Sequence, residues 1–105
     1  GDYVNSFLIS QSILKKDSTL EDAWLNAGLA KYNQGVNLEH DTKNLKQKRQ
    51  QVLHYYKEAL PYFEKYRSLC PSNVDKWAMP LYSIYLNLNM GKQFDEIDEI
   101  IQKQK

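Results

Sequence analysis

The sequence contains a single cysteine, Cys70, which rules out an internal disulfide and a Cys-x-x-Cys pair for zinc or thiol exchange. It has no apolar run of about 18 residues or more and no charged N-terminal stretch followed by an apolar one, so we expect neither a membrane-spanning helix nor a signal peptide within these residues. Four glycines and three prolines accompany eight tyrosines, three phenylalanines and two tryptophans. Few helix breakers and many aromatic rings indicate a helical domain packed through its rings.

Positive and negative charges also nearly balance, because 14 basic and 13 acidic side chains leave a net charge of +1. No long-range field therefore marks the chain as a nucleic-acid or membrane-surface binder. A chain of 105 residues is long enough to bury one continuous core, which predicts a single domain over residues 1–105. The helical pattern begins almost at the first residue, so we expect the chain to be part of a longer protein.

Apolar spacing predicts a helix over residues 3–16 and a second one from about 20 to 35, which could continue toward Leu38, with Ser18 or Thr19 as its cap. Gly28 lies inside the second helix, where a glycine costs about 0.5–1 kcal/mol relative to alanine. We therefore expect Gly28 to leave room for a large neighbour, and Trp24, one turn earlier, is the predicted neighbour. The expected single apolar stripe of the first helix comprises Phe7, Leu8, Ile9, Ile13 and Leu14.

The polar stretch that follows predicts a turn near 39–42, capped by Asp41 or Thr42, and then one helix of about seven turns that ends at Leu69. Its first half is expected to project beyond the core. Pro61 predicts a bend near 57–59 or a helix boundary there. The second half places Ala59, Phe63 and Tyr66 on one side, facing the helix that contains Gly28.

Two further helices are predicted. One spans about 74–90 and stops at Gly91, with Pro80 marking either a kink or a start near Met79. The other covers about 94–101, apolar on one side and acidic on the other, and is expected to cap the core. Five helices, short turns and no strand candidate predict an all-α fold of stacked antiparallel hairpins.

Comparison of the segments indicates an internal repeat, because the large-aromatic helix that begins at Ala23 is followed, after a second helix, by another large-aromatic helix that ends at Gly91. AWLNAGLAKYNQG and ALPYFEKYRSLCPSN supply, in register, a large aromatic, small residues, a second aromatic and a proline. In this the chain resembles a tetratricopeptide repeat protein, of a bacterial, Bacteroidetes-type variant with an elongated hairpin. The residues that carry the resemblance are Trp24, Gly28, Gly35, Ala59, Phe63 and Pro71.

The resemblance implies a right-handed stack of hairpins in which 3–16 is the trailing helix of a preceding repeat, 20–73 a long repeat and 74–104 a final repeat and cap. The sequence departs from the family pattern at Lys31, where an aromatic is usual, and in residues 36–58, an insertion that makes the hairpin unusually tall. An extra turn also precedes Leu81. The family resemblance is compatible with an exported bacterial location.

The resemblance implies a scaffold that binds a protein or peptide, with no catalysis and no cofactor. Leu25 and Leu29 stand where chaperone-binding members carry a carboxylate clamp, so binding of a chaperone tail is not expected. An apolar or extended partner segment would suit a wall of leucine and tyrosine. In the family this wall is the inner, concave one and forms the binding groove. Its positions, carried over from the family, are Asp22, Leu25, Leu29, Tyr32, Asn33, Tyr82, Leu86 and Asn89.

Other readings remain open at this point. The exposed faces could serve self-association, as a homo-oligomer or as a structural module within a longer chain. A nucleic-acid reading has less support, because no aromatic residue lies among the basic residues of 43–49. His40 and His54 are too far apart along the chain for one helical metal site, and no histidine or nucleophile accompanies the acidic residues of 95–99. The basic cluster comprises Lys43, Lys46, Lys48, Arg49 and Lys57.

Overall fold

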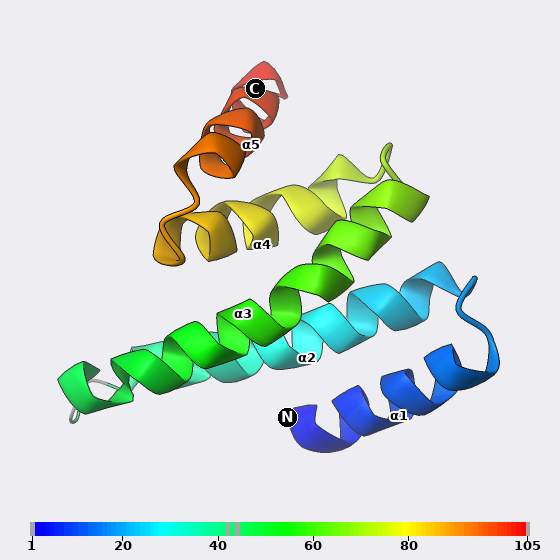
Figure 1. Ribbon diagram of the computed structural model, residues 1–105, viewed down its shortest axis with the longest axis horizontal. Helices are drawn as coiled ribbons and strands as arrows, with labels where there is room; N and C mark the ends of the chain where they lie inside the picture. The colour runs from blue at the N-terminus through cyan, green and yellow to red at the C-terminus, as the bar shows by residue number, and fades with distance from the viewer. Residues whose placement is uncertain (1, 42, 44, 105) are drawn as a thin grey trace.

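The computed structural model describes residues 2–41, 43 and 45–104. Within these residues the chain forms five helices and no strand, which confirms the all-helical hairpin stack (Figure 1). Each helix packs against the next along the chain, and the molecule measures 40 × 35 × 20 Å. The helices are α1 (Tyr3–Lys16), α2 (Glu21–His40), α3 (Leu45–Leu69), α4 (Val74–Asn87) and α5 (Gly91–Lys103).

The α2–α3 hairpin is tall, as expected, with helices of 20 and 25 residues. Pro61 lies inside α3 and ends no helix, and the ribbon of α3 changes direction toward α4 in its second half (Figure 1). The expected projection of the first half of α3 is wrong: Val52 and Tyr56 are buried there. The physical reason is that α2 continues past Gly35 to His40 and runs alongside this part of α3. Thr42, one of the two expected caps, lies outside the described residues.

The core is centred on the predicted face of α3. Ala59, Phe63 and Tyr66 are all fully buried, in one cluster with side chains of α2, α4 and α5. A β-carbon on Gly28 would lie 3.1 Å from the ring of Phe63, so the ring occupies the gap that this glycine leaves. The expectation that Trp24 fills the gap is wrong. Helical side chains tilt toward the helix N-terminus, so the tryptophan ring extends away from Gly28.

Trp24 instead ties α2 to the turn before it. Its indole N–H donates a hydrogen bond to the Ser18 carbonyl at 2.9 Å, and its ring packs against Tyr62 with centroids 5.8 Å apart. Trp77 does the same for α4, donating to the Cys70 carbonyl at 3.2 Å. Each tryptophan is the fourth residue of its helix, so the α2–α3 and α4–α5 hairpins begin with the same local arrangement.

The start of α2 differs from the prediction in its cap. Leu20 occupies the capping position without a side-chain hydrogen bond, whereas Ser18 or Thr19 was expected there. The side chain of Asp17 accepts hydrogen bonds from the backbone N–H and the hydroxyl of Thr19, which closes the turn and lowers the pKa of Asp17. The first turn of α2 is supported by the carboxylates of Glu21 and Asp22, which favour the positive end of the helix dipole.

The end of α4 also differs from the prediction, because Gly91 is the first residue of α5 and stops nothing. The stop is made by Asn89, which adopts a left-handed backbone with φ of 58°. The N–H of Met90 bonds to the Tyr85 carbonyl at 2.9 Å and that of Asn89 to the Leu86 carbonyl at 3.3 Å, the pattern of a Schellman cap. Asparagine tolerates this backbone better than most residues. Pro80 lies well inside α4, so no helix starts near Met79.

The apolar residues of α1 divide between two sides, whereas a single stripe was predicted. Phe7 and Leu14 are half-buried and Ser10 is buried, while the other three residues of the predicted stripe are exposed. The Phe7 ring meets Tyr62 edge to face at 5.5 Å, and the Lys31 ammonium lies 4.3 Å from its centre. These aromatic contacts fix which side of α1 faces the hairpin.

Candidate functional site

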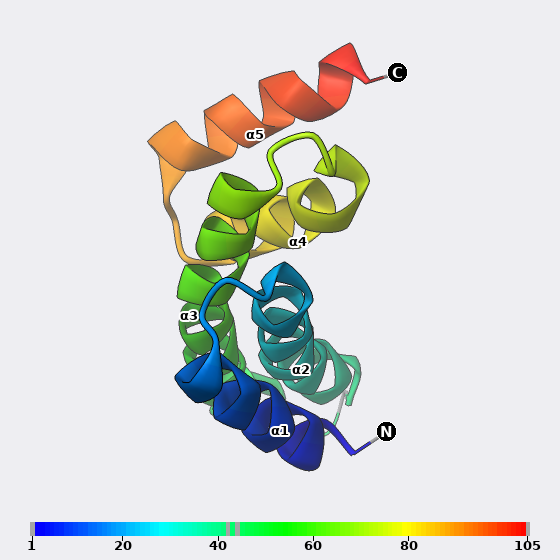
Figure 2. The same cartoon turned by 90° about the vertical axis from the view of Figure 1, so that its right-hand side faces the viewer.

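The eight residues predicted to form a binding wall come from α2, from α4 and from the turn after α4. Figure 2 shows α2 and α4 one above the other, on the same side of α3. Their identification as partner-binding residues stays a prediction. On α2 they are Asp22, Leu25, Leu29, Tyr32 and Asn33, and on α4 and its end they are Tyr82, Leu86 and Asn89.

On α2, burial separates the predicted residues. Leu25 is only 8% exposed and belongs to the core cluster, so it offers little surface to a partner. Leu29 and Tyr32 are half-buried and pack against that cluster, so each presents one edge outward. Asp22 is exposed and Asn33 half-buried, and they add polar groups to the same helix.

Tyr32 is held in place by the aromatic core. Its ring stacks on Tyr56 with centroids 5.5 Å apart and an interplanar angle of 29°. It also meets Phe63 edge to face at 6.0 Å. A ring fixed by two neighbours loses little conformational freedom when a partner covers its outer edge, which favours binding.

On α4, the predicted residues carry an apolar surface that sequence reasoning saw only in part. Leu86 is 53% exposed, and Tyr82 is half-buried with its ring 4.7 Å from that of Phe94 on α5. Met79, 56% exposed, was not predicted. The signal was present in the sequence, because Met79, Tyr82 and Leu86 are spaced i, i+3, i+7 and must share one side of a helix.

The opposite side of α4 is the core itself, where Trp77, Leu81, Ile84 and Tyr85 are buried. A surface helix ordinarily has one apolar face, and α4 has two. The second face is exposed. We call the following set the α2–α4 wall: Asp22, Leu29, Tyr32, Asn33, Met79, Tyr82 and Leu86.

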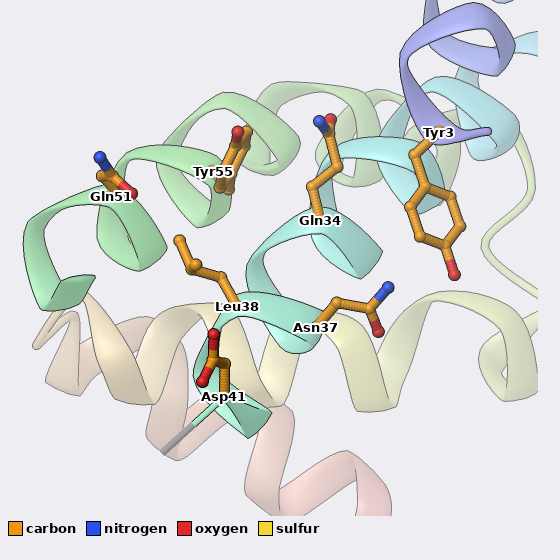
Figure 3. Close-up of a pocket in the computed structure, with 7 residues that line it drawn as sticks. All are labelled: Tyr3, Gln34, Asn37, Leu38, Asp41, Gln51 and Tyr55. Carbon is orange, nitrogen blue, oxygen red and sulfur yellow. The ribbon is translucent and has the colours of Figure 1, made fainter. Parts of the chain in front are cut away.

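A separate hollow of about 370 Å³ lies where the tall hairpin extends past the start of α1 (Figure 3). Amide side chains and two tyrosine rings surround it, with Leu38 between α2 and α3. The buried oxygen of the Gln34 side chain has no hydrogen-bond partner. The hollow is shallow and open, and none of the predicted wall residues lines it. Its lining comprises Tyr3, Gln34, Asn37, Leu38, Asp41, Gln51 and Tyr55.

Two buried tyrosines join α3 to its neighbours through carboxylates. Tyr56 donates to Glu39 of α2 at 2.7 Å, and Tyr85 of α4 donates to Glu64 of α3 at 2.9 Å. Burial raises the pKa of both phenols well above the ordinary value of 10, and the carboxylate that accepts each hydrogen bond raises it further.

We expect the protein to lose stability steadily above pH 10 because of these two tyrosines. The folded chain keeps both phenols protonated where the unfolded chain ionises them, so the unfolded state binds fewer protons and the free energy of unfolding falls as pH rises. Urea unfolding between pH 8 and pH 11 measures this effect. The double variant Tyr56→Phe and Tyr85→Phe should show a shallower decline, and an identical slope in both proteins would contradict the assignment.

Two side chains of the basic cluster make contacts that hold the hairpin together. Lys48 pairs with Asp41, which lowers the pKa of that carboxyl. One guanidinium nitrogen of Arg49 lies 3.7 Å from a carboxylate oxygen of Glu39. The other donates a hydrogen bond of 3.0 Å to the side-chain oxygen of Asn87, the last residue of α4. Two of the five basic side chains therefore hold the inserted part of the hairpin in place.

The described residues include no group of three or more His, Cys, Asp or Glu side chains placed to hold a metal ion. His54 pairs instead with Glu58 on the same helix, at 2.8 Å. Partial burial raises the pKa of the Cys70 thiol, and the nearby charge of Glu21 raises it further, so the thiolate is disfavoured there. No helix in the described part of the chain is long and apolar enough to cross a membrane.

Comparison of the chain with protein-family models, with curated proteins and with solved structures returned no match.

Proposed function

We propose that this chain is a tetratricopeptide-like, non-catalytic scaffold that binds a polypeptide segment along the α2–α4 wall. The observation that carries the proposal is the second apolar face of α4, where Met79 and Leu86 are each more than half exposed. An exposed apolar strip on a protein surface is typical of a protein interaction site.

The two hairpins support the repeat interpretation. Both begin with a tryptophan at the fourth helical position that bonds back to the preceding turn. In the first hairpin, a glycine of α2 accommodates a phenylalanine ring of α3. Stacked hairpins of this kind place the first helix of each pair along one side of the stack. This arrangement lets α2 and α4 share the α2–α4 wall.

The chemistry of the wall indicates the kind of segment that it would take. Met79 and Leu86 lie two turns apart and offer contacts for apolar side chains, and methionine adapts to different shapes. The tyrosine rings of the wall supply rigid, partly apolar edges between these contacts. Asp22 and Asn33 on α2 can accept or donate hydrogen bonds to a partner backbone. An extended or helical segment with two apolar anchors fits this arrangement.

Peptides selected from a displayed random library against the immobilised chain provide the test. Their affinity is then measured by fluorescence anisotropy for the wild type and for the double variant Met79→Lys and Leu86→Lys. We expect the double variant to bind about tenfold or more weakly, because two exposed anchors are replaced by charges. Both side chains are exposed, so the circular dichroism of the variant should match that of the wild type.

The matched control is Leu8→Lys with Ile9→Lys on α1, which places the same two charges on equally exposed apolar residues away from the wall. This control should bind the selected peptides within about twofold of the wild type. Equal losses in the two double variants, or none in either, would contradict the proposal.

A further inference from the structure

The outer side of α1 carries four of the eight large apolar side chains that are exposed in the described chain. Ile9 and Leu8 are 61% and 54% exposed, and Val4 and Ile13 on the same helix are exposed as well. A hollow of about 390 Å³ lies among Leu8, Ile9 and Ile13. An apolar face of this kind gains free energy when another surface covers it.

The outer side of α1 also carries two short polar side chains that permit close approach. Asn5 and Ser12 line the same hollow, seven residues apart, and follow the row of exposed aliphatic side chains. Small side chains along one row of a helix let a second helix come near and pack its larger residues on either side. The face therefore has the shape that a partner helix requires.

The charges of α1 are placed so that the helix complements itself. The acidic side chains of α1 and its caps are Asp2, at the N-cap, and Asp17, at the C-cap, and the basic ones are Lys15 and Lys16, in the last turn. The N-terminal end is therefore negative, and the C-terminal end keeps a net positive charge. If a second α1 packs antiparallel on the first, the carboxylate of each lies beside the ammonium groups of the other. A parallel arrangement would put like charges together, which is unfavourable.

The register of such a pair follows from the spacing. Asp2 and Lys16 are equally distant from Ile9, seven residues or about 10 Å along the helix. A two-fold axis at Ile9 therefore places the two Ile9 side chains together and Asp2 of one copy opposite Lys16 of the other. A single self-complementary patch of this type is what a two-fold dimer needs.

We propose that the outer face of α1 is a two-fold interface on which a second copy of this chain packs antiparallel. The interface is a single helix face, smaller than the roughly 800 Å² per partner of a standard complex, so the dimer is weak and reversible. The dimer leaves Met79 and Leu86 free, because these residues lie on α4, which packs on α3 and α5. Two walls in one particle would bind a partner that carries two copies of a segment with added avidity. The inference goes beyond the proposed function and does not depend on it.

Sedimentation equilibrium over a range of chain concentrations tests the dimer. The wild type should pass from monomer to dimer as concentration rises, whereas Ile9→Asp should weaken dimerisation by about tenfold or more, because it places a charge on the two-fold axis. Leu86→Asp, an equally exposed change on α4, should dimerise as the wild type does. A wild type that stays monomeric throughout, or an Ile9→Asp variant that dimerises normally, would overturn the proposal.

Charge reversal tests the antiparallel direction. Asp2→Lys alone and Lys16→Asp alone should each dimerise more weakly. In a homodimer of either variant, residues 2 and 16 of the two copies carry charges of the same sign and repel each other at both ends. An equimolar mixture of the two variants should recover dimers, because every end then pairs opposite charges. Asp2→Asn controls for the N-cap, since asparagine also caps helices. A mixture that dimerises no better than its components would overturn the antiparallel arrangement.

Discussion

Replacing Phe63 with alanine is expected to lower the free energy of unfolding by about 3–5 kcal/mol, the largest effect of any single substitution considered for this chain. The ring is fully buried, fills the gap at Gly28 and meets Tyr32 edge to face. Its removal takes away the apolar burial of the ring and leaves a cavity between α2 and α3 that a rigid helical hairpin cannot close.

Urea unfolding followed by circular dichroism measures this loss, provided that the variant still folds at low temperature. Met79→Ala is the matched comparison, since it also shortens an apolar side chain but on the surface, and its effect should stay within about 0.5 kcal/mol. A Phe63→Ala loss below about 1 kcal/mol would mean that the ring is not at the centre of the packing.

The second large effect is expected at Gly35, where alanine should destabilise the protein although alanine is the better helix former. A β-carbon at Gly35 would lie 2.7 Å from the Tyr56 ring. That ring cannot move aside cheaply, because it stacks on Tyr32 and its hydroxyl is bonded to Glu39. Overpacking of this kind costs about 1–3 kcal/mol, which exceeds the gain in helix propensity of about 1 kcal/mol.

The other helical glycines provide a graded control for Gly35. At Gly28 the added β-carbon would lie 3.1 Å from the Phe63 ring, which is a smaller misfit than at Gly35. The stability of Gly28→Ala should therefore lie between that of Gly35→Ala and that of Gly91→Ala. A β-carbon added at Gly91 would meet no side chain and no other segment of the chain within 4 Å. The Gly91→Ala variant should therefore be as stable as the wild type or more stable. Thermal melts of the three variants give the order directly. A stabilising Gly35→Ala would contradict the close approach of α2 and α3.

The hairpins could be predicted from sequence because their signals are local. The apolar face of Ala59, Phe63 and Tyr66 follows the helical period, and few helix breakers interrupt α3. The partner of Gly28 could not be predicted in the same way, because the ring that fills the gap comes from a different helix. The stop of α4 was misplaced because asparagine and glycine both suit a left-handed residue, and the sequence offers Asn89 and Gly91 two positions apart.

The candidate site was predictable to a smaller extent. Positions on the outer side of α2 and α4 followed from the family resemblance, but periodicity does not separate a residue half in the core, such as Tyr32, from one that is free, such as Leu86. Leu25 is buried because it belongs to the core cluster, together with side chains of α3, α4 and α5. The orientation of α1 also depends on tertiary contacts, since aliphatic residues occupy both of its sides.

Backbone amide chemical shifts, recorded while a selected peptide is added to the isotope-labelled chain, test the proposed binding wall most directly. If the proposal is right, the largest changes cluster at Met79, Tyr82 and Leu86 on α4 and at Leu29 and Asn33 on α2, while α1 changes little. Changes concentrated instead around Gln34 and Tyr55, or on α1, would contradict it.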